Sequence, residues 1–220
     1  MVCDKLRIRF RKGGDLRLIG HHDLMRCFER MLRRADLPVH WTQGFNPKPR
    51  LAIALSLGLG IIGCQEVAEL ELDAPLEPED AKRRLHSEAP AGLEILSVTR
   101  IDPRAGGRVR RACYRIAIPV SRIPELAPGI ASILGAGRCL VERGQPQARQ
   151  IDLRPHIRDL RVIDGNLEMD LRVTPHGTAR PREILKLLGL HDLLNSGAVL
   201  ERTVLELEDE CAVPQPEGNS

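Results

Sequence analysis

The sequence predicts an α+β protein made of two tandem ferredoxin-like units, each with the element order β-α-β-β-α-β and an antiparallel sheet. Several segments alternate apolar and polar residues, as strands with one buried face do. Other segments repeat apolar residues at helical spacing, and the two kinds follow one another in the split βαβ order. At 220 residues, with 42% hydrophobic and 29% charged residues, the chain has enough apolar material to fold rather than remain disordered.

The first unit is expected to cover residues 1–101. Its first strand, Lys5–Lys12, alternates apolar and basic residues, so that one face enters a core and the other presents arginines. The following helix, His22–Asp36, begins after Gly20 in the N-cap position, carries an apolar stripe and ends before Pro38. The other expected elements are the strands 50–57 and 65–73, the helix 77–87 and the strand 93–101.

The second unit is expected to cover residues 113–210. A basic stretch with two glycines at 102–112 predicts a linker before it. Within the unit, residues 160–173 predict a hairpin that turns at Asp164-Gly165-Asn166, and residues 211–220 predict a tail. The other expected elements are the strands 113–120, 138–143 and 199–208 and the helices 124–134 and 181–188.

Positive charge is concentrated in the first 50 residues. They contain 12 Lys or Arg against 5 Asp or Glu, while the net charge of the whole chain is +3, so the remainder is net negative. Such asymmetry is typical of a protein with one basic face, which attracts anionic partners. The alternative is a basic face that is simply solvated.

The cysteines give no sign of a metal centre. All six stand singly, without the paired spacing of a zinc ribbon or an iron-sulfur cluster, so we expect no metal and no cofactor bound by this chain. We also expect no secretory leader and no membrane-spanning segment, because no apolar run is long enough. A cytoplasmic location and free thiols follow from this expectation.

The loop at 41–50 is unusual because it combines two aromatic rings, a glycine, two prolines and two cations. Exposed rings stack on nucleic-acid bases, with a contribution of about 1 to 3 kcal/mol per base. Trp41 and Phe45 are therefore candidates for base stacking, and the alternative is that both rings plug the core. Four of the five aromatic residues of the chain precede residue 46.

The other residues of this loop predict a stiff backbone. Gly44 permits a positive φ, and Asn46 is held extended by the proline that follows it. Pro47 and Pro49 restrict the chain further. A stiff loop suits recognition because little entropy is lost on binding, and it equally suits a structural corner.

The helix before this loop presents arginines at i, i+4 and i+7, which places them on one face. Guanidinium forks match the oxygens of phosphate groups, and the loop adds two further cations. The candidate phosphate ligands are Arg26, Arg30, Arg33, Lys48 and Arg50. The alternative is a solvated or internally paired face, in which Glu29 pairs with Arg33.

His21 is a candidate acid or base, because the reference pKa of histidine, about 6.5, suits proton transfer. The alternative is a polar residue that anchors the start of the helix. A metal site is not expected here, since His21, His22 and Asp23 are adjacent and adjacent helical side chains diverge by roughly 100°.

Three arginines of the second half are candidate anion ligands. Arg154 and Arg180 each precede a proline, and Arg202 lies in the last expected strand. These arginines can converge on an anion, or can instead form salt bridges to Asp152 or Glu201.

The chain resembles the bacterial radical SAM-linked protein family, an uncharacterised group whose members are encoded beside, or fused to, a radical SAM protein. The matching segments are R-F-R-K-G-G-D-L-R at 9–17, H-x-D-L-M-R at 21–26, F-E-R-x-L-R-R-A at 28–35, L-P at 37–38, Q-G-F-N-P-x-P-R at 43–50, D-L-R-P at 152–155 and R-P-R-E-I-L-K-L-L at 180–188. The chain departs from the family pattern at Gly20, where a serine is usual, and at Gly63-Cys64, where an acidic pair is usual.

The resemblance implies a radical SAM protein as a partner, so SAM and an iron-sulfur cluster are expected only on that partner. Together with the basic helix and aromatic loop, it favours an accessory RNA-binding protein acting in tRNA or rRNA modification or processing, without catalytic activity of its own. Two alternatives stay open. One is a metal-independent ribonuclease or RNA-modifying enzyme using His21, since the expected fold is loosely similar to that of the CRISPR repeat-processing endoribonucleases. The other is a protein adaptor for the radical SAM partner.

Overall fold

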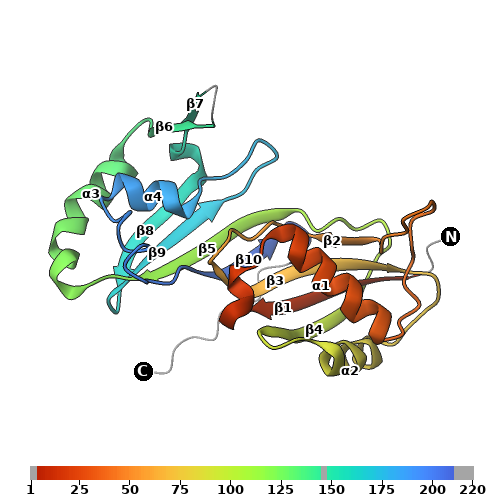
Figure 1. Cartoon of the computed structure of the whole chain (residues 1–220). Helices are drawn as coiled ribbons and strands as arrows, with labels where there is room; N and C mark the ends of the chain where they lie inside the picture. The colour runs from red at the N-terminus through yellow and green to blue at the C-terminus, as the bar shows by residue number, and fades with distance from the viewer. Residues whose placement is uncertain (1–3, 145–147, 211–220) are drawn as a thin grey trace, which may run out of the picture.

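The computed structural model describes residues 4–144 and 148–210, which form an α+β protein with a mostly antiparallel sheet (Figure 1). The sequence-based prediction of the α+β class is confirmed. The strands are β1 (Asp4–Lys12), β2 (Leu51–Ile53), β3 (Ile62–Leu72), β4 (Leu93–Ile101), β5 (Val109–Ala117), β6 (Leu140–Arg143), β7 (Arg149–Asp152), β8 (Ile157–Ile163), β9 (Asn166–Arg172) and β10 (Glu201–Leu207). The helices are α1 (His21–Arg34), α2 (Pro78–Glu88), α3 (Ile123–Gly135) and α4 (Pro181–Leu187), and three short 3-10 segments lie at Gly14–Leu18, Val120–Arg122 and Arg154–His156.

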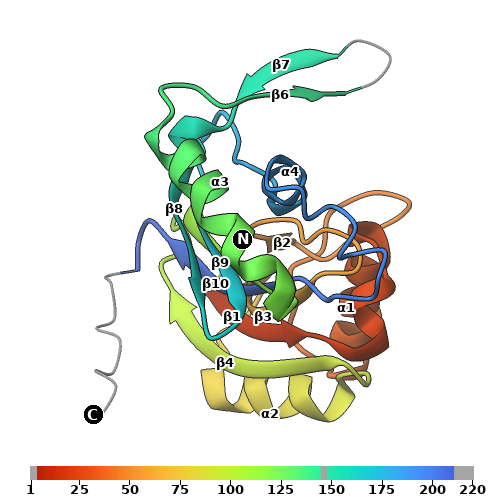
Figure 2. The same cartoon turned by 90° about the vertical axis from the view of Figure 1, so that its left-hand side faces the viewer.

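The first half of the chain places its strands in the order β4-β1-β3, with β2 also paired to β3. All of these pairings are antiparallel, and the register sets Ile8 opposite Ala68 on one side and Val98 on the other. The helices α1 and α2 cover one face of these strands, where their apolar residues join those of β1, β3 and β4 in a common core (Figure 2).

The second half repeats this arrangement of strands, in the order β10-β5-β9-β8, again antiparallel throughout. Helix α3 lies between β5 and β8 in the chain, and α4 lies between β9 and β10. A separate two-stranded sheet of β6 and β7 follows α3 and stands apart from the main sheet in both views. Strand β7 was not expected from the sequence, because the segment R-Q-I-D has only one apolar residue.

The two halves share one eight-stranded sheet instead of forming two separate sheets. The junction is a short parallel pairing of β10 with β3, in which Glu201 lies opposite Ile62 and Arg202 opposite Gly63. Strand β5 begins at Val109, inside the stretch expected as a linker. The expected tail at 211–220 lies outside the described residues.

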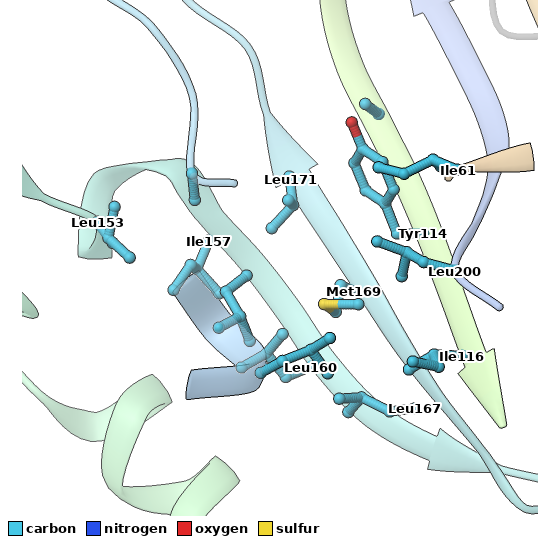
Figure 3. Close-up of a cluster of buried hydrophobic side chains, with 14 of the residues drawn as sticks. Ile61, Tyr114, Ile116, Leu153, Ile157, Leu160, Leu167, Met169, Leu171 and Leu200 are labelled. Carbon is cyan, nitrogen blue, oxygen red and sulfur yellow. The ribbon is translucent and has the colours of Figure 1, made fainter. Parts of the chain in front are cut away.

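The core consists of two clusters of buried apolar side chains. One joins α1 and α2 to the first half of the sheet. The other joins α3 and α4 to the second half, and Figure 3 shows its side chains gathered on β5, β8 and β9, including Tyr114, Leu160 and Met169. This second cluster also contains Leu57, Ile61 and Val67 from the first half of the chain. The two halves are therefore connected by packing as well as by the sheet.

Two basic residues of β1, Lys5 and Arg7, are paired with acidic side chains from other parts of the chain. Arg7 is buried and donates to Glu69 at 2.8 Å and to Asp209 at 2.7 Å, while Lys5 Nζ lies 2.8 Å from Glu69. Burial by itself raises the pKa of Glu69, but its contacts with Lys5 and Arg7 outweigh burial and hold the pKa below the ordinary value. Lys5 and Arg7 thus belong to an internal ion-pair network.

No helix within residues 4–144 and 148–210 is long and apolar enough to cross a membrane.

Candidate nucleic-acid interface

Helix α1 separates an apolar face from a cationic face. Leu24, Cys27, Phe28, Met31 and Leu32 are buried against the sheet, at the 3- and 4-residue spacing of one helical stripe. This packing fixes the rotation of the helix, and Arg26, Arg30 and Arg33 therefore point into solvent. The helix begins after Gly20 without a side-chain cap, so its first N–H groups have no serine or aspartate acceptor in the N-cap position.

The exposed arginines of α1 form only weak internal pairs. Arg26, with 76% of its side chain exposed, lies 3.4 Å from Asp23, and Arg33 lies 3.1 Å from Glu29. Arg30 has no ion-pair or hydrogen-bond partner for its side chain among residues 4–144 and 148–210. Exposed pairs of this kind contribute only about 0 to 1 kcal/mol, so a phosphate group can displace them at little cost.

The loop after α1 is closed by backbone contacts near its base. Trp41 forms an isolated antiparallel bridge with Pro49, the amide of Thr42 donates to the carbonyl of Lys48 at 2.9 Å, and the amide of Lys48 donates to the Thr42 hydroxyl at 3.0 Å. The amide of Arg50 donates to the carbonyl of His40 at 2.9 Å. These contacts leave residues 43–47 as a tip that projects from the body of the protein in both views.

The two aromatic residues of the loop have different environments. Trp41 is half-buried and packs against the core of the first half, and the Arg33 guanidinium lies 4.3 Å from the centre of its ring. The apolar core and the Arg33 guanidinium thus cover much of the Trp41 ring. Phe45, in contrast, is fully exposed at the tip. Of the two rings, Phe45 is the one whose faces are open to a stacking partner.

The remaining loop residues hold this tip in place. Gly44 has a φ of +124°, which residues with a Cβ rarely adopt. Asn46 and Pro47 are exposed, and Pro49 is half-buried beside Trp41. The side chains of Lys48 and Arg50 are exposed and have no ion-pair or hydrogen-bond partner within the described part of the chain. Of the predicted site residues, the structure brings Arg33 of α1 into contact with Trp41 of the loop.

His21 lies at the first position of α1 and is only partly exposed. Its Nδ1 atom is buried without a hydrogen-bond partner among the described residues, and its ring lies edge-on to that of His22 with the ring centres 5.8 Å apart. No carboxylate orients the imidazole within the described residues. The arrangement therefore lacks the base-orienting contact that activated catalytic histidines generally have.

The prediction that Arg202 is an anion ligand requires correction. Its side chain is 1% exposed and forms an ion pair with the equally buried Glu66, with 2.8 Å between Nε and Oε1. It also donates to the carbonyl of Leu55 at 2.8 Å and to the Tyr114 hydroxyl at 3.4 Å. Burial lowers the pKa of Arg202, but Glu66 more than offsets this effect, so the group stays charged and fully engaged.

The other two arginines predicted in the second half do not converge on Arg202. Arg154 donates to the carbonyls of Leu134 and Ile157, at 2.9 and 2.7 Å, and so holds the end of α3. Arg180 is exposed at the start of α4, where its backbone N–H donates to Glu183 at 2.9 Å. The expected salt bridges to Asp152 and Glu201 do not involve these side chains either, since Glu201 pairs with Arg115.

No group of three or more metal-ligating residues occurs among residues 4–144 and 148–210. The four described cysteines, Cys27, Cys64, Cys113 and Cys139, are free. Burial raises the pKa of each of these thiols, to about 11 for Cys113, which keeps them protonated near neutral pH.

Sequence reasoning missed a second cluster of arginines, on β5, β8 and β9. The cluster contains Arg110, Arg111, Arg158 and Arg172, which line one hollow. Alternation with buried residues places Arg111 and Arg172 on the exposed face of each strand. The pairing of the strands, which local patterns do not specify, brings these residues together.

No curated protein is detectably similar to this chain. Among solved structures, an unknown protein from Galdieria sulphuraria is 15% identical, with a TM-score of 0.29 over 93% of this chain and 98% of the other. A putative glycine cleavage system transcriptional repressor is 9% identical, with a TM-score of 0.23 over 90% of this chain and 95% of the other.

The family comparison is more extensive, because it covers most of the chain. Residues 5–181 match a family described as "Uncharacterized protein conserved in bacteria (DUF2344)", and the chain belongs to this family.

Proposed function

We propose that this chain is an accessory RNA-binding protein whose contact surface is formed by the cationic face of α1 and the tip of the 41–50 loop. The observation that carries the proposal is the fully exposed ring of Phe45, held on a closed loop whose base contacts the helix through Trp41 and Arg33. A fully exposed phenylalanine buries almost no surface in the fold, which leaves both faces of its ring available to a partner.

The charges around this ring favour a nucleic acid. Arg26, Arg30 and Arg33 on the helix, with Lys48 and Arg50 on the loop, are all exposed. Guanidinium and ammonium groups bind phosphates, while an aromatic ring stacks on bases of any sequence. The combination is typical of proteins that bind single-stranded nucleic acid without strong sequence preference.

The wider proposal concerns the partner and the architecture. The resemblance to the radical SAM-linked family suggests that the chain delivers RNA, such as a tRNA or rRNA, to a radical SAM enzyme that carries SAM and the iron-sulfur cluster. The matching strand orders of the two halves support a design of two tandem ferredoxin-like units joined edge to edge through β3 and β10. Each unit would then present one sheet face without helices.

A protein adaptor is the second candidate, because an exposed aromatic ring on a stiff loop also suits docking to another protein. In this case Phe45 contacts the radical SAM partner directly and RNA plays no part. Catalysis by His21 has weaker support, since its only distinctive feature is the unpartnered Nδ1 atom.

The test is a fluorescence anisotropy titration of a labelled single-stranded RNA of mixed sequence, at low ionic strength. We expect the unmodified protein to bind and Phe45→Ala to bind roughly 5- to 150-fold more weakly, the equivalent of one stacked base. Val120→Ala is the matched control, because Val120 is also highly exposed but lies in the second half. Equal RNA affinities for Phe45→Ala and Val120→Ala would show that the 41–50 loop does not contact the RNA.

The same variants separate the RNA-binding and adaptor hypotheses. If the loop serves only as a protein dock, the unmodified chain does not bind RNA, while Phe45→Ala loses co-purification with the radical SAM partner from nuclease-treated extracts. If the chain instead binds RNA, the purified chain binds the labelled RNA by itself. Alternatively, nuclease treatment weakens the co-purification of the unmodified chain with the radical SAM partner.

A further inference from the structure

Among the residues that the structure describes, one face of the second half of the sheet carries no helix. Helices α3 and α4 pack on the face that presents Ala112, Tyr114 and Leu171. The intervening residues therefore lie on the opposite face of the sheet. There Arg111 on β5 is partly buried and Arg172 on β9 is exposed.

Two arginines on this face are placed directly against each other. Arg111 lies opposite Arg172 in the antiparallel register of β5 and β9, and side chains at such positions share a face with Cβ atoms about 4.5 to 5.5 Å apart. Like charges directly opposite each other destabilise a sheet. Arg110 and Arg158 line the same hollow and add to the repulsion.

Nearby carboxylates neutralise this cluster only in part. Asp170 lies 2.8 Å from Arg111 and 3.6 Å from Arg158, and Glu206 pairs with Arg110 and lies 3.5 Å from Arg111. Arg172 has no ion-pair or hydrogen-bond partner for its side chain within the described ranges of the chain. Two carboxylates thus pair with three of the four guanidinium groups, and the cluster keeps a net positive charge.

The cluster lines two adjoining hollows. One, of about 500 Å³, is bounded by Arg110, Arg111, Arg158, Arg172, Val173 and Glu206. The other, of about 570 Å³, is bounded by Arg154, Pro155, Ile157, Arg158 and Arg172. Arg158 and Arg172 line both hollows, which therefore adjoin. Together they form one open, cationic groove where β8 begins and β9 ends.

We propose that this groove, which we call the second-half arginine groove, binds phosphate groups of the same RNA that contacts α1 and the 41–50 loop. The inference rests on the proposed function, and it adds a second contact surface on the other half of the chain. An open groove shared by two hollows suits a chain of phosphates better than a compact ligand. Its lining offers few apolar side chains, so a peptide would find little to contact there besides charge.

The test compares Arg158→Gln/Arg172→Gln with the unmodified protein, using a labelled 30-nucleotide single-stranded RNA over a range of salt concentrations. We expect the double variant to bind at least 10-fold more weakly. Each lost phosphate contact to a single strand reduces the slope of log affinity against log salt by about 0.7, so the slope should become less steep by about 1.4.

The matched control is Arg115→Gln/Arg161→Gln, which removes two arginines from the same sheet face. Both are paired, Arg115 with Glu201 at 2.7 Å and Arg161 with Glu168 at 3.1 Å, and neither bounds the groove. We expect its affinity to stay within about twofold of the unmodified protein, because neighbouring carboxylates already neutralise both guanidinium groups.

A charge-reversal variant separates a loss of RNA binding from a loss of protein stability. Arg172→Glu places a carboxylate opposite Arg111, and opposite charges in such a cross-strand pair are stabilising. We expect its melting temperature to equal or exceed that of the unmodified protein while its RNA affinity falls about as far as in Arg158→Gln/Arg172→Gln, because the two variants change the net charge equally.

Several results would overturn the groove assignment. One is an unchanged affinity and salt slope in Arg158→Gln/Arg172→Gln when Phe45→Ala still weakens binding, which would leave the proposed function intact. Another is displacement of the RNA by polyglutamate, or by inorganic phosphate at equal total phosphate, as effectively as by unlabelled RNA. If the unmodified protein binds no RNA at all, the proposed function and the groove fail together.

Discussion

Arg202 of β10 forms a fully buried ion pair with Glu66 of β3, with 2.8 Å between Nε of Arg202 and Oε1 of Glu66. The two residues are 136 positions apart in the chain, and their strands are the two that join the halves of the sheet. Gly63, opposite Arg202, is required for this geometry, because a Cβ there would lie 2.4 Å from the Glu66 side chain.

Removing one member of this pair is expected to destabilise the whole protein. Arg202→Met leaves the Glu66 carboxylate buried without its main partner, which typically costs about 3 to 5 kcal/mol in the free energy of unfolding. Urea denaturation measures this change. In the double variant Arg202→Met/Glu66→Leu we expect most of the loss to be recovered, since both charges are gone. A single variant that loses less than about 1 kcal/mol would contradict the structural role of the pair.

The network around Glu69 predicts a specific response to acid. Because the folded-state pKa of Glu69 is lowered below its ordinary value of 4.5, its ionised form stabilises the fold above that value. The stabilisation is lost as the pH falls through the folded-state pKa. Glu69→Gln should therefore be less stable than the unmodified protein at pH 7. The difference in urea midpoint should shrink below about pH 4.5, and a difference that grows in acid would refute the assignment.

The two loop aromatics should differ in their effect on stability. Trp41→Ala removes a ring that packs on the core and under Arg33, and we expect a loss of about 1 to 3 kcal/mol. Phe45→Ala removes a fully exposed ring and should change stability by less than about 0.5 kcal/mol. Thermal or urea unfolding of both variants makes the comparison. Equal losses would mean that the Phe45 ring packs against the protein in solution.

Cys113 is expected to be a poor nucleophile. Burial, opposed by the Arg111 guanidinium and aided by Asp170, raises the pKa of its thiol to about 11, so only about one thiol in a thousand is ionised at pH 8. Its alkylation by iodoacetamide in the folded protein, followed by peptide mass spectrometry, should be at least tenfold slower than in the protein unfolded by urea. Comparable rates in the two states would show that the thiol is accessible and ordinary.

Local sequence patterns predicted most of the secondary structure but not how the halves join. The alternation in β1 and the apolar stripe of α1 are strong signals, and both elements lie within two residues of their expected bounds. Strand β5 starts earlier than expected because Gly106 and Gly107 obscure its beginning. The parallel pairing of β10 with β3 brings together residues 139 positions apart, and such long-range pairing leaves no local pattern to read.

The candidate site was predictable in its composition but not in its exposure. The spacing of Arg26, Arg30 and Arg33 was enough to place them on one helical face. Whether an aromatic residue in the next loop turns inward depends on tertiary packing, and here Trp41 packs on the core while Phe45 does not. The burial of Arg202 was hidden from sequence for the same reason, because its partner lies in the other half of the chain.

The most direct test of the RNA-binding surface is the salt dependence of affinity for a single-stranded RNA. We expect log affinity to fall linearly with log salt, and Arg26→Gln/Arg30→Gln to make the slope less steep by about 1.4, or about 0.7 per phosphate contact. The control Arg83→Gln/Arg138→Gln, which also removes two exposed arginines, should keep the original slope. Binding that does not depend on salt, or a slope that the two double variants change equally, would contradict an RNA interface on α1.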